Sequence, residues 1–464
     1  MHESMKGKQN GPGIPGTWFK DEEAANTEGY PILFVHGINS SSAAWIKEND
    51  MLPITRGAGY QSVFIELHPD EDMWRNGEML ADKLREMYEY FNEKIVVVGH
   101  SKGGIDTQAA LIHYGASPYV ERVITLSTPH HGSELADLAF SKWAGWLTDA
   151  LKSKTPAVFS LQTGYMKGFR SETDGQDPVK DVPIYTFGGT GWGGANSELF
   201  WGGLYLSRFG QSDGAVLVRS SRLPYAKEVA VQDWTHTTIK KGSEVFPFLK
   251  NLYTEMVKEV PYAKVSEMAS EDETSVLHRG GEFDGTVVES FFVEEGMGKI
   301  TVDWISNLSD SAYELVSPDG QLYKQWGMAE DATGYFPGAY HHSILLSDPL
   351  SGRWEVRAKS GQREHYMVSI LFHKKRKEVV SALGGGDTVL KRTYTIHYIP
   401  MQSGKKSSVL ITTEDLTSLP LADFDEGIHN ITLDIEGKTS LGNEYQRTKI
   451  QTVYVDGKGN IYGM

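Results

Sequence analysis

The chain has 464 residues, of which 39% are hydrophobic, and its formal net charge is -16 at pH 7. This length predicts two to four domains, and the negative charge argues against nucleic acid or an anionic membrane as the partner. The chain has no cysteine, which excludes disulfides, thiolate metal sites and cysteine nucleophiles. No apolar run is long enough to cross a membrane, so no integral membrane segment is expected.

Residues 1–258 alternate short apolar runs with segments of helical periodicity, after a polar, glycine-rich arm over residues 1–30. Strands alternating with helices predict a mostly parallel, doubly wound α/β sheet. The arm lacks the apolar core of a signal peptide, so we expect a secreted protein without its signal peptide, or a cytoplasmic one. The runs expected to form strands are 31–37, 62–67, 95–98, 122–126, 183–187 and 227–231.

Two insertions, 133–180 and 190–212, interrupt this rhythm after strand ends, where substrates bind in α/β folds. In the first, Trp143 and Trp146 share a helical stripe with Leu147 and Leu151. The second is rich in glycine and aromatic residues, among them Trp201. These tryptophans are expected to bind substrate as part of a lid; the alternative is that the stripe is ordinary core.

Past residue 258 the pattern changes to alternating apolar runs separated by turn signals, which is typical of all-β sandwiches. A polar, acidic stretch from Val260 to Ser275 predicts a linker. A basic run from Lys374 and the triplet Gly384-Gly385-Gly386 predict a second break. We therefore expect a β-sandwich domain over 275–374 and a second, immunoglobulin-like one over 387–464.

The motif with the clearest chemistry is Gly99-His100-Ser101-Lys102-Gly103, which fits G-x-S-x-G. It follows the buried run 95–98 and precedes helical spacing, the context in which a serine stands on a sharp strand-to-helix turn. The serine hydroxyl needs a general base and donors for the developing oxyanion. The expected donors are the backbone N–H groups of Ile38, in the loop after the first buried strand, and of Lys102.

The base is expected to be a late histidine, and His236 follows the last predicted strand. His130 and His131 also follow a strand; they are interpreted as hydrogen-bonded loop residues, with a metal site as the alternative. The triad acid is expected to be Asp213, with Asp181 and Asp233 as competitors. Asp181 lies at the wrong end of its strand, and Asp233 is on the loop of His236 itself.

Residues 30–257 resemble the α/β-hydrolase superfamily, specifically bacterial true lipases and related esterases. The matching pieces are Val35-His36-Gly37-Ile38, the Ser101 motif, Ser127-Thr128-Pro129-His130-His131-Gly132-Ser133, Ser212-Asp213-Gly214-Ala215-Val216 and His236. In that family the Ser-Asp-Gly-x-Val segment carries the triad acid, which implies Asp213 here. Several members bind calcium through an aspartate just after the histidine, but Thr237 and Thr238 stand there, so no metal is expected.

The sequence thus predicts a serine carboxylester hydrolase that needs no cofactor, most closely a lipase acting on triacylglycerols. Its partner would be an acyl-ester lipid, met through the lid and the C-terminal β domains, and no nucleic acid is expected. The alternatives are a polyester or polyhydroxyalkanoate depolymerase with the same triad, or a non-enzymatic adhesin with a degenerate hydrolase domain.

Overall fold

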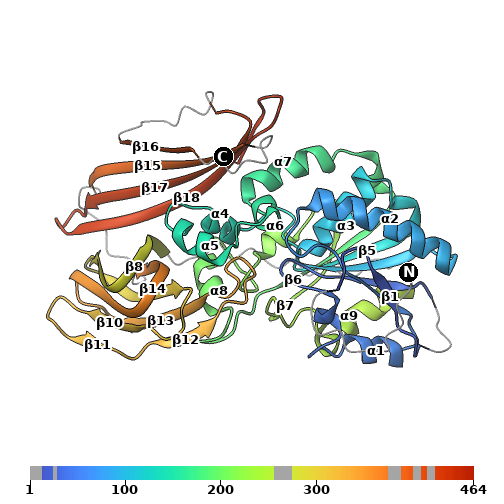
Figure 1. The fold of residues 1–464 in the computed structure, drawn as a ribbon, viewed down its shortest axis with the longest axis horizontal. Coiled ribbons are helices and arrows are strands. Elements are labelled where there is room, and N and C mark those ends of the chain that lie inside the picture. Colours follow the sequence, from blue (N-terminus) through green and yellow to red (C-terminus); the bar gives the residue numbers. More distant parts are fainter. Residues whose placement is uncertain are drawn as a thin grey trace, which may run out of the picture.

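The computed structural model describes residues 13–24, 29–254, 274–374, 388–400, 409–414 and 424–463. They form an α/β part that ends at Thr254 and a tail that begins at Thr274. The tail lies along one side of the α/β part (Figure 1). Most of the linker expected over 260–275 and the break expected over 374–387 fall outside the described residues.

A seven-stranded sheet in the order β1-β3-β2-β4-β5-β6-β7 is the centre of the α/β part. All neighbours from β3 to β7 are parallel, and β1 is antiparallel at the edge. The predicted doubly wound, mostly parallel sheet is confirmed. Its strands are β1 (Trp18–Lys20), β2 (Ile32–Val35), β3 (Ser62–Ile65), β4 (Ile95–His100), β5 (Val120–Leu126), β6 (Ile184–Gly189) and β7 (Lys227–Gln232).

Helices cover both faces of this sheet, with α2 and α3 on one face and α1 and α9 on the other (Figure 1). Successive strand residues point to opposite faces, so Leu33 and Val35 pack under α2 while Ile32 and Phe34 pack under α1 and α9. Because helices cover both faces of the sheet, successive residues of a strand are all apolar and do not alternate with polar ones. The bounds are α1 (Met51–Gly57), α2 (Met73–Phe91), α3 (Lys102–His113) and α9 (Gly242–Thr254), with short 3-10 helices at Ser42–Trp45, Ser117–Tyr119, Asp177–Lys180 and Val218–Ser221.

Five short helices occupy the two segments that interrupt the alternation of strands and helices. They are α4 (Glu134–Ala139), α5 (Gly145–Leu151), α6 (Pro156–Ser160), α7 (Thr163–Thr173) and α8 (Phe200–Leu206). Helices α4, α5 and α7 contact strands of the tail. The insertions therefore form much of the boundary between the α/β part and the tail.

The tail consists of antiparallel sheets, as predicted for an all-β region. One sheet has the order β11-β10-β14-β9-β13-β12, with β8 paired to β14, and the other has the order β16-β15-β17-β18-β19. The division at 275–374 and 387–464, and the immunoglobulin-like character of the last part, stay predictions. The strands are β8 (Thr274–Val293), β9 (Met297–Ser306), β10 (Ala312–Val316), β11 (Leu322–Tyr323), β12 (Gly327–Glu330), β13 (Tyr340–Ser347), β14 (Gly352–Lys374), β15 (Thr388–Pro400), β16 (Val409–Glu414), β17 (Gly427–Lys438), β18 (Glu444–Val455) and β19 (Ile461–Tyr462).

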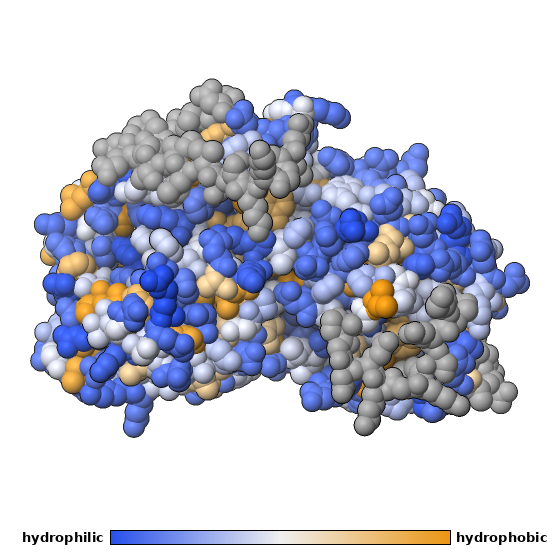
Figure 2. Space-filling model, viewed as in Figure 1, coloured by the Kyte–Doolittle hydropathy of each residue, from blue (hydrophilic) through white to orange (hydrophobic). Residues whose placement is uncertain are grey.

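The boundary between the two parts is buried and combines apolar packing with hydrogen bonds. Asp137 of α4 accepts a hydrogen bond from Thr452 of β18 at 2.9 Å, and Trp143 donates to Asp434 of β17 at 2.9 Å. One apolar cluster contains residues from both parts. The outer face in Figure 2 is mostly hydrophilic, in keeping with the net charge. Among the described residues, no helix is both long and apolar enough to span a bilayer.

Candidate active site

Ser101 stands at the sharp turn between β4 and α3, where the sequence motif predicted it. Its backbone has φ 54° and ψ −133°, a combination that non-glycine residues rarely adopt and that is held at functional turns. The turn needs a small residue at position 99, because a Cβ on Gly99 would lie 2.7 Å from the backbone nitrogen of Gly104. The local fold thus presents the Ser101 side chain at the carboxyl edge of the central sheet.

The loop after β2 lies against Ser101. A Cβ on Gly37 would come within 2.8 Å of the Ser101 Cβ, so only glycine permits this approach. The ring of His36 fixes the loop: its Nδ1 hydrogen-bonds to the Gly37 carbonyl oxygen at 2.9 Å, and its Nε2 accepts from the Leu67 backbone N–H at 3.0 Å. Burial lowers the pKa of His36, which agrees with a neutral, structural ring. Ile38 is held beside the serine.

Lys102 begins α3, where backbone N–H groups have no acceptor inside the helix. Its side chain is turned into the protein and forms a 2.5 Å ion pair with Asp106, which also accepts from Asn76 at 3.1 Å. Burial raises the pKa of Asp106 to about 6, although the charge of Lys102 opposes the shift. The Lys102 side chain is therefore engaged inside the protein, and the role of its backbone N–H as an oxyanion donor stays a prediction.

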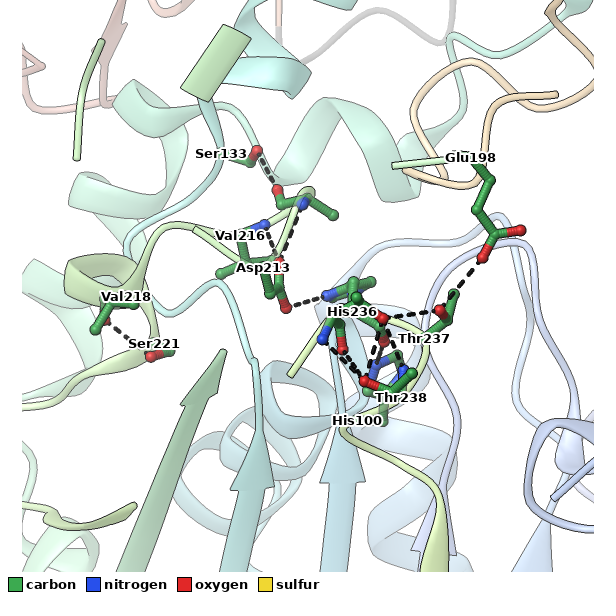
Figure 3. Close-up of polar contacts among 12 residues, drawn as sticks. His100, Ser133, Glu198, Asp213, Val216, Val218, Ser221, His236, Thr237 and Thr238 are labelled. Carbon is green, nitrogen blue, oxygen red and sulfur yellow. Dashed lines mark hydrogen bonds and ion pairs between the residues drawn. The ribbon is translucent and has the colours of Figure 1, made fainter. Parts of the chain in front are cut away.

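Asp213 and His236 form a buried pair (Figure 3). The Asp213 Oδ2 atom lies 2.7 Å from the His236 Nδ1 atom. The other carboxylate oxygen, Oδ1, accepts the backbone N–H groups of Ala215 at 3.0 Å and Val216 at 2.7 Å. The backbone N–H of His236 also donates to the backbone carbonyl oxygen of Asp213 at 2.9 Å, and this hydrogen bond joins the two loops. The competing carboxylates Asp181 and Asp233 are both exposed to solvent.

His100 packs against His236, a contact that its place inside the G-x-S-x-G motif did not predict. Its Nε2 hydrogen-bonds to the His236 carbonyl oxygen at 2.9 Å, and the two rings pack with centroids 4.7 Å apart. Burial lowers the pKa of His100 well below its usual value, and the neighbouring His236 and Lys240 add to this effect. A neutral His100 ring with its proton on Nε2 can donate to that carbonyl and so anchor the His236 loop.

His130 and His131 make hydrogen bonds within the protein, as interpreted from the sequence. His130 contacts the Gln108 Oε1 atom at 3.0 Å and the Thr125 hydroxyl at 3.3 Å, and His131 contacts the Arg222 carbonyl oxygen at 3.1 Å. The alternative of a metal site finds no support in these contacts.

A loop of the tail, residues 330–338, covers Ser101 and His236; we call it the covering loop. A cavity of about 300 Å³ lies between this loop and the region of the α/β part around Ser101. The α/β side of that cavity is lined by Gly37, Ile38, Asn39, Ser40, His100, Ser101, His236, Thr237 and Lys240, and the tail side by Glu330, Asp331, Ala332, Thr333, Gly334, Pro337 and Gly338. Alternation in the tail sequence predicts strands, but nothing in it indicates that a connecting loop reaches the catalytic edge.

The covering loop is held at its middle and at its base. Asn39 donates its side-chain amide to the Gly334 carbonyl oxygen at 2.8 Å. At the base, the buried His341 ring bridges Asp303, at 3.0 Å, and Asp331, at 3.2 Å. Burial lowers the pKa of His341, but the two carboxylates outweigh it and raise the value to about 10. A charged His341 thus fixes the start of the loop.

The structure separates the three tryptophans expected to bind substrate. Trp143 packs against the tail through its hydrogen bond to Asp434, and Trp146 is 52% exposed on the surface. Neither of them lines the cavity at Ser101. Trp201 of α8 is buried beside the covering loop, with its ring 6.1 Å from that of Phe336.

Comparisons with known proteins give one matching family model and similar solved structures. Residues 71–155 match the family model of a PGAP1-like alpha/beta domain. The chain is 39% identical to the Bacillus licheniformis lipase BlEst2 in its propeptide form, with a TM-score of 0.87 over 97% of this chain and 100% of that one. It is 52% identical to the mature form of BlEst2, with a TM-score of 0.50 over 52% of this chain and 100% of that one. No curated protein matches.

Proposed function

Since the chain belongs to the α/β-hydrolase family of bacterial lipases and esterases, we propose that it is a lipase that uses Ser101, His236 and Asp213 as its catalytic triad. The class of reaction, hydrolysis of a carboxylic ester by a serine hydrolase, follows from the family. The observation that carries the residue assignment is the 2.7 Å contact between Asp213 and His236 at the cavity that Ser101 also lines. Triacylglycerols are the proposed substrates, and secretion is part of the proposal.

In this mechanism the Ser101 Oγ attacks the ester carbonyl while the His236 Nε2 takes its proton. The backbone N–H groups of Ile38 and Lys102 stabilise the oxyanion of the tetrahedral intermediate. His236 then returns the proton to the leaving alcohol, and an acyl-enzyme forms on Ser101. Water, activated by the same histidine, hydrolyses the acyl-enzyme and restores the serine.

Asp213 determines which imidazole nitrogen carries the proton. Its Oδ2 faces the His236 Nδ1 atom, so Nδ1 keeps a proton and Nε2 is left with the lone pair that a base needs. Its Oδ1 is held by two backbone N–H groups, so the carboxylate cannot rotate without losing hydrogen bonds in a buried place.

We further propose that the tail acts as a propeptide. The similar BlEst2 lipase has a propeptide form that matches 97% of this chain and a mature form that matches 52% of it. Here the covering loop lies over Ser101 and is hydrogen-bonded to Asn39, next to the proposed oxyanion donor. These contacts favour a covering role for the tail over the lipid-surface binding expected from the sequence.

Cutting the chain between residues 254 and 274 and separating the tail should raise kcat/KM for p-nitrophenyl butyrate at least about tenfold, because the ester then reaches Ser101 without displacing the loop. The measurement compares cut, separated protein with uncut protein passed through the same buffers and column. Equal activity of the two preparations would contradict a covering role. A cut Ser101→Ala chain controls for contaminating esterase.

His100→Phe should lower kcat about 10- to 100-fold with little change in KM. The phenyl ring can still pack against His236, but the hydrogen-bond donor to the His236 carbonyl oxygen is lost. His100→Gln carries a side-chain N–H near the same place and should restore part of the rate. Steady-state kinetics of both cut variants test this positioning role. An equal loss in the two variants, or a loss confined to KM, would refute it.

A further inference from the structure

We propose that the apolar groove filled by Tyr335 and Phe336 of the covering loop is the groove that binds the acyl chain of the substrate. This inference rests on the proposed function and names the subsite of the same active site. In the full chain the two aromatic side chains occupy the place of the acyl chain, while the loop backbone covers the reacting atoms.

Most of the covering loop lines the cavity over Ser101, whereas the side chains of Tyr335 and Phe336 point away from that cavity. Residues 330–334 and 337–338 line the cavity over Ser101. Tyr335 and Phe336, between them, leave the cavity and are buried at 2% and 0% exposure. Gly334 makes the bend, with φ +83° and its Cα so near Ile38 that an added Cβ would lie 3.1 Å from the Ile38 side chain. The loop thus turns two aromatic rings into the α/β part just beyond Ile38.

The groove is lined largely by the α/β part, although the apolar cluster there also contains Ile305 and Met367 of the tail. Tyr335 and Phe336 are members of an apolar cluster whose other members include Leu135 of α4, Trp201 and Tyr205 of α8, and Leu217. Phe336 meets the edge of the Trp201 ring at 82° between the ring planes. Thr333, at the entrance, lies so close to α8 that a Cβ on Gly202 would be 2.7 Å from its methyl group. Without the loop, Trp201 would lose the ring of Phe336 that packs on it, and the neighbouring α/β members of the cluster would lose their cover.

Ile38 connects this groove to the reacting atoms. Its side chain packs against the apolar cluster, and the residue also lines the cavity that contains Ser101. An ester whose carbonyl oxygen is held by the Ile38 N–H therefore has the groove next to it. Beside His236, the cavity has a polar flank lined by Thr237 and Lys240. Because His236 gives its proton to the leaving alcohol, the alcohol fits that polar flank and the acyl chain fits the groove.

The test uses the full chain with Phe336→Ala, which vacates the groove, and Phe336→Trp, which keeps it filled. Met328→Ala, on the neighbouring β12 and 52% exposed, is the matched control. The readouts are kcat/KM for p-nitrophenyl acetate, butyrate and octanoate, and the rate at which methyl and octyl phosphonates label Ser101. Circular dichroism and gel filtration confirm that each variant is folded.

Phe336→Ala should raise the octanoate-to-acetate ratio of kcat/KM at least about tenfold, and octyl phosphonate should show the same selective gain. Phe336→Trp and Met328→Ala should show neither gain. An equal gain for all acyl lengths, no gain, or a gain that follows the alcohol in a series of butyrate esters would overturn the groove assignment while leaving the hydrolase intact. Loss of all ester hydrolysis and labelling in every chain, cut or uncut, would overturn the proposed function together with it.

Discussion

Ser101→Ala should lower kcat for ester hydrolysis at least about a thousandfold, because the attacking oxygen is removed while the oxyanion donors remain. The substitution is mild for the fold. Alanine and serine both carry a Cβ, so the strained backbone at φ 54° is no worse in the variant than in the natural chain. The measurement is the rate of p-nitrophenyl butyrate hydrolysis by the cut, tail-free protein.

Two controls make this result specific. Thermal unfolding of Ser101→Ala should resemble that of the unaltered chain, and Ser212→Ala, which removes another buried serine hydroxyl near Asp213, should keep most of the activity. A Ser101→Ala protein that stays folded and retains more than about a tenth of the rate would show that another group is the nucleophile.

Asp213→Asn should lower kcat by up to about four orders of magnitude with the fold unchanged. The reason lies in the other contacts of Asp213. The backbone N–H groups of Ala215 and Val216 both need an acceptor, so the amide oxygen of asparagine would take the place of Oδ1. The amide N–H₂ would then face the His236 Nδ1 atom. The Nδ1 atom would then have to accept a hydrogen bond from the amide, so the imidazole proton would sit on Nε2. His236 could no longer take the proton of Ser101.

Asp233→Asn is the matched control, because Asp233 lies three residues before His236 but is exposed. It should change kcat less than about threefold. The reverse pattern, with Asp233→Asn inactive and Asp213→Asn active, would show that the acid is local to the histidine loop. Steady-state kinetics of the two cut variants decide between the outcomes.

The central sheet and the residues at its carboxyl edge are local in sequence, which is why they could be predicted. Four branched apolar residues before Gly99 make a buried strand, and the small residues after it permit the turn at Ser101. Ile38 and His236 each follow a strand that ends at the same sheet edge. Hydrophobic periodicity and the residues at turns are therefore enough to predict these strands and the residues that follow them. The roles of these residues stay predictions until variants are measured.

The docking of the tail could not be predicted, because the contacts that fix it join residues that are distant in the chain. Asn39 and Gly334 are 295 positions apart, and Trp143 and Asp434 are 291 apart. The helical stripe of Trp143 indicates an apolar face but not what covers that face. A helix in a lid and a helix that packs against the tail would have the same sequence pattern. Trp146 lies at the surface, and its expected contact with substrate stays a prediction.

The most direct test of Ser101 as the nucleophile under a covering tail is covalent labelling of the full and the cut chain by an alkyl p-nitrophenyl phosphonate, read by intact mass and peptide mapping. We expect one adduct per chain, on Ser101, formed at least about tenfold faster once the tail has been separated. An adduct on any other residue, or none in the cut chain, would contradict the assignment of Ser101. Equal labelling rates in the two forms would contradict the covering of the site by the tail.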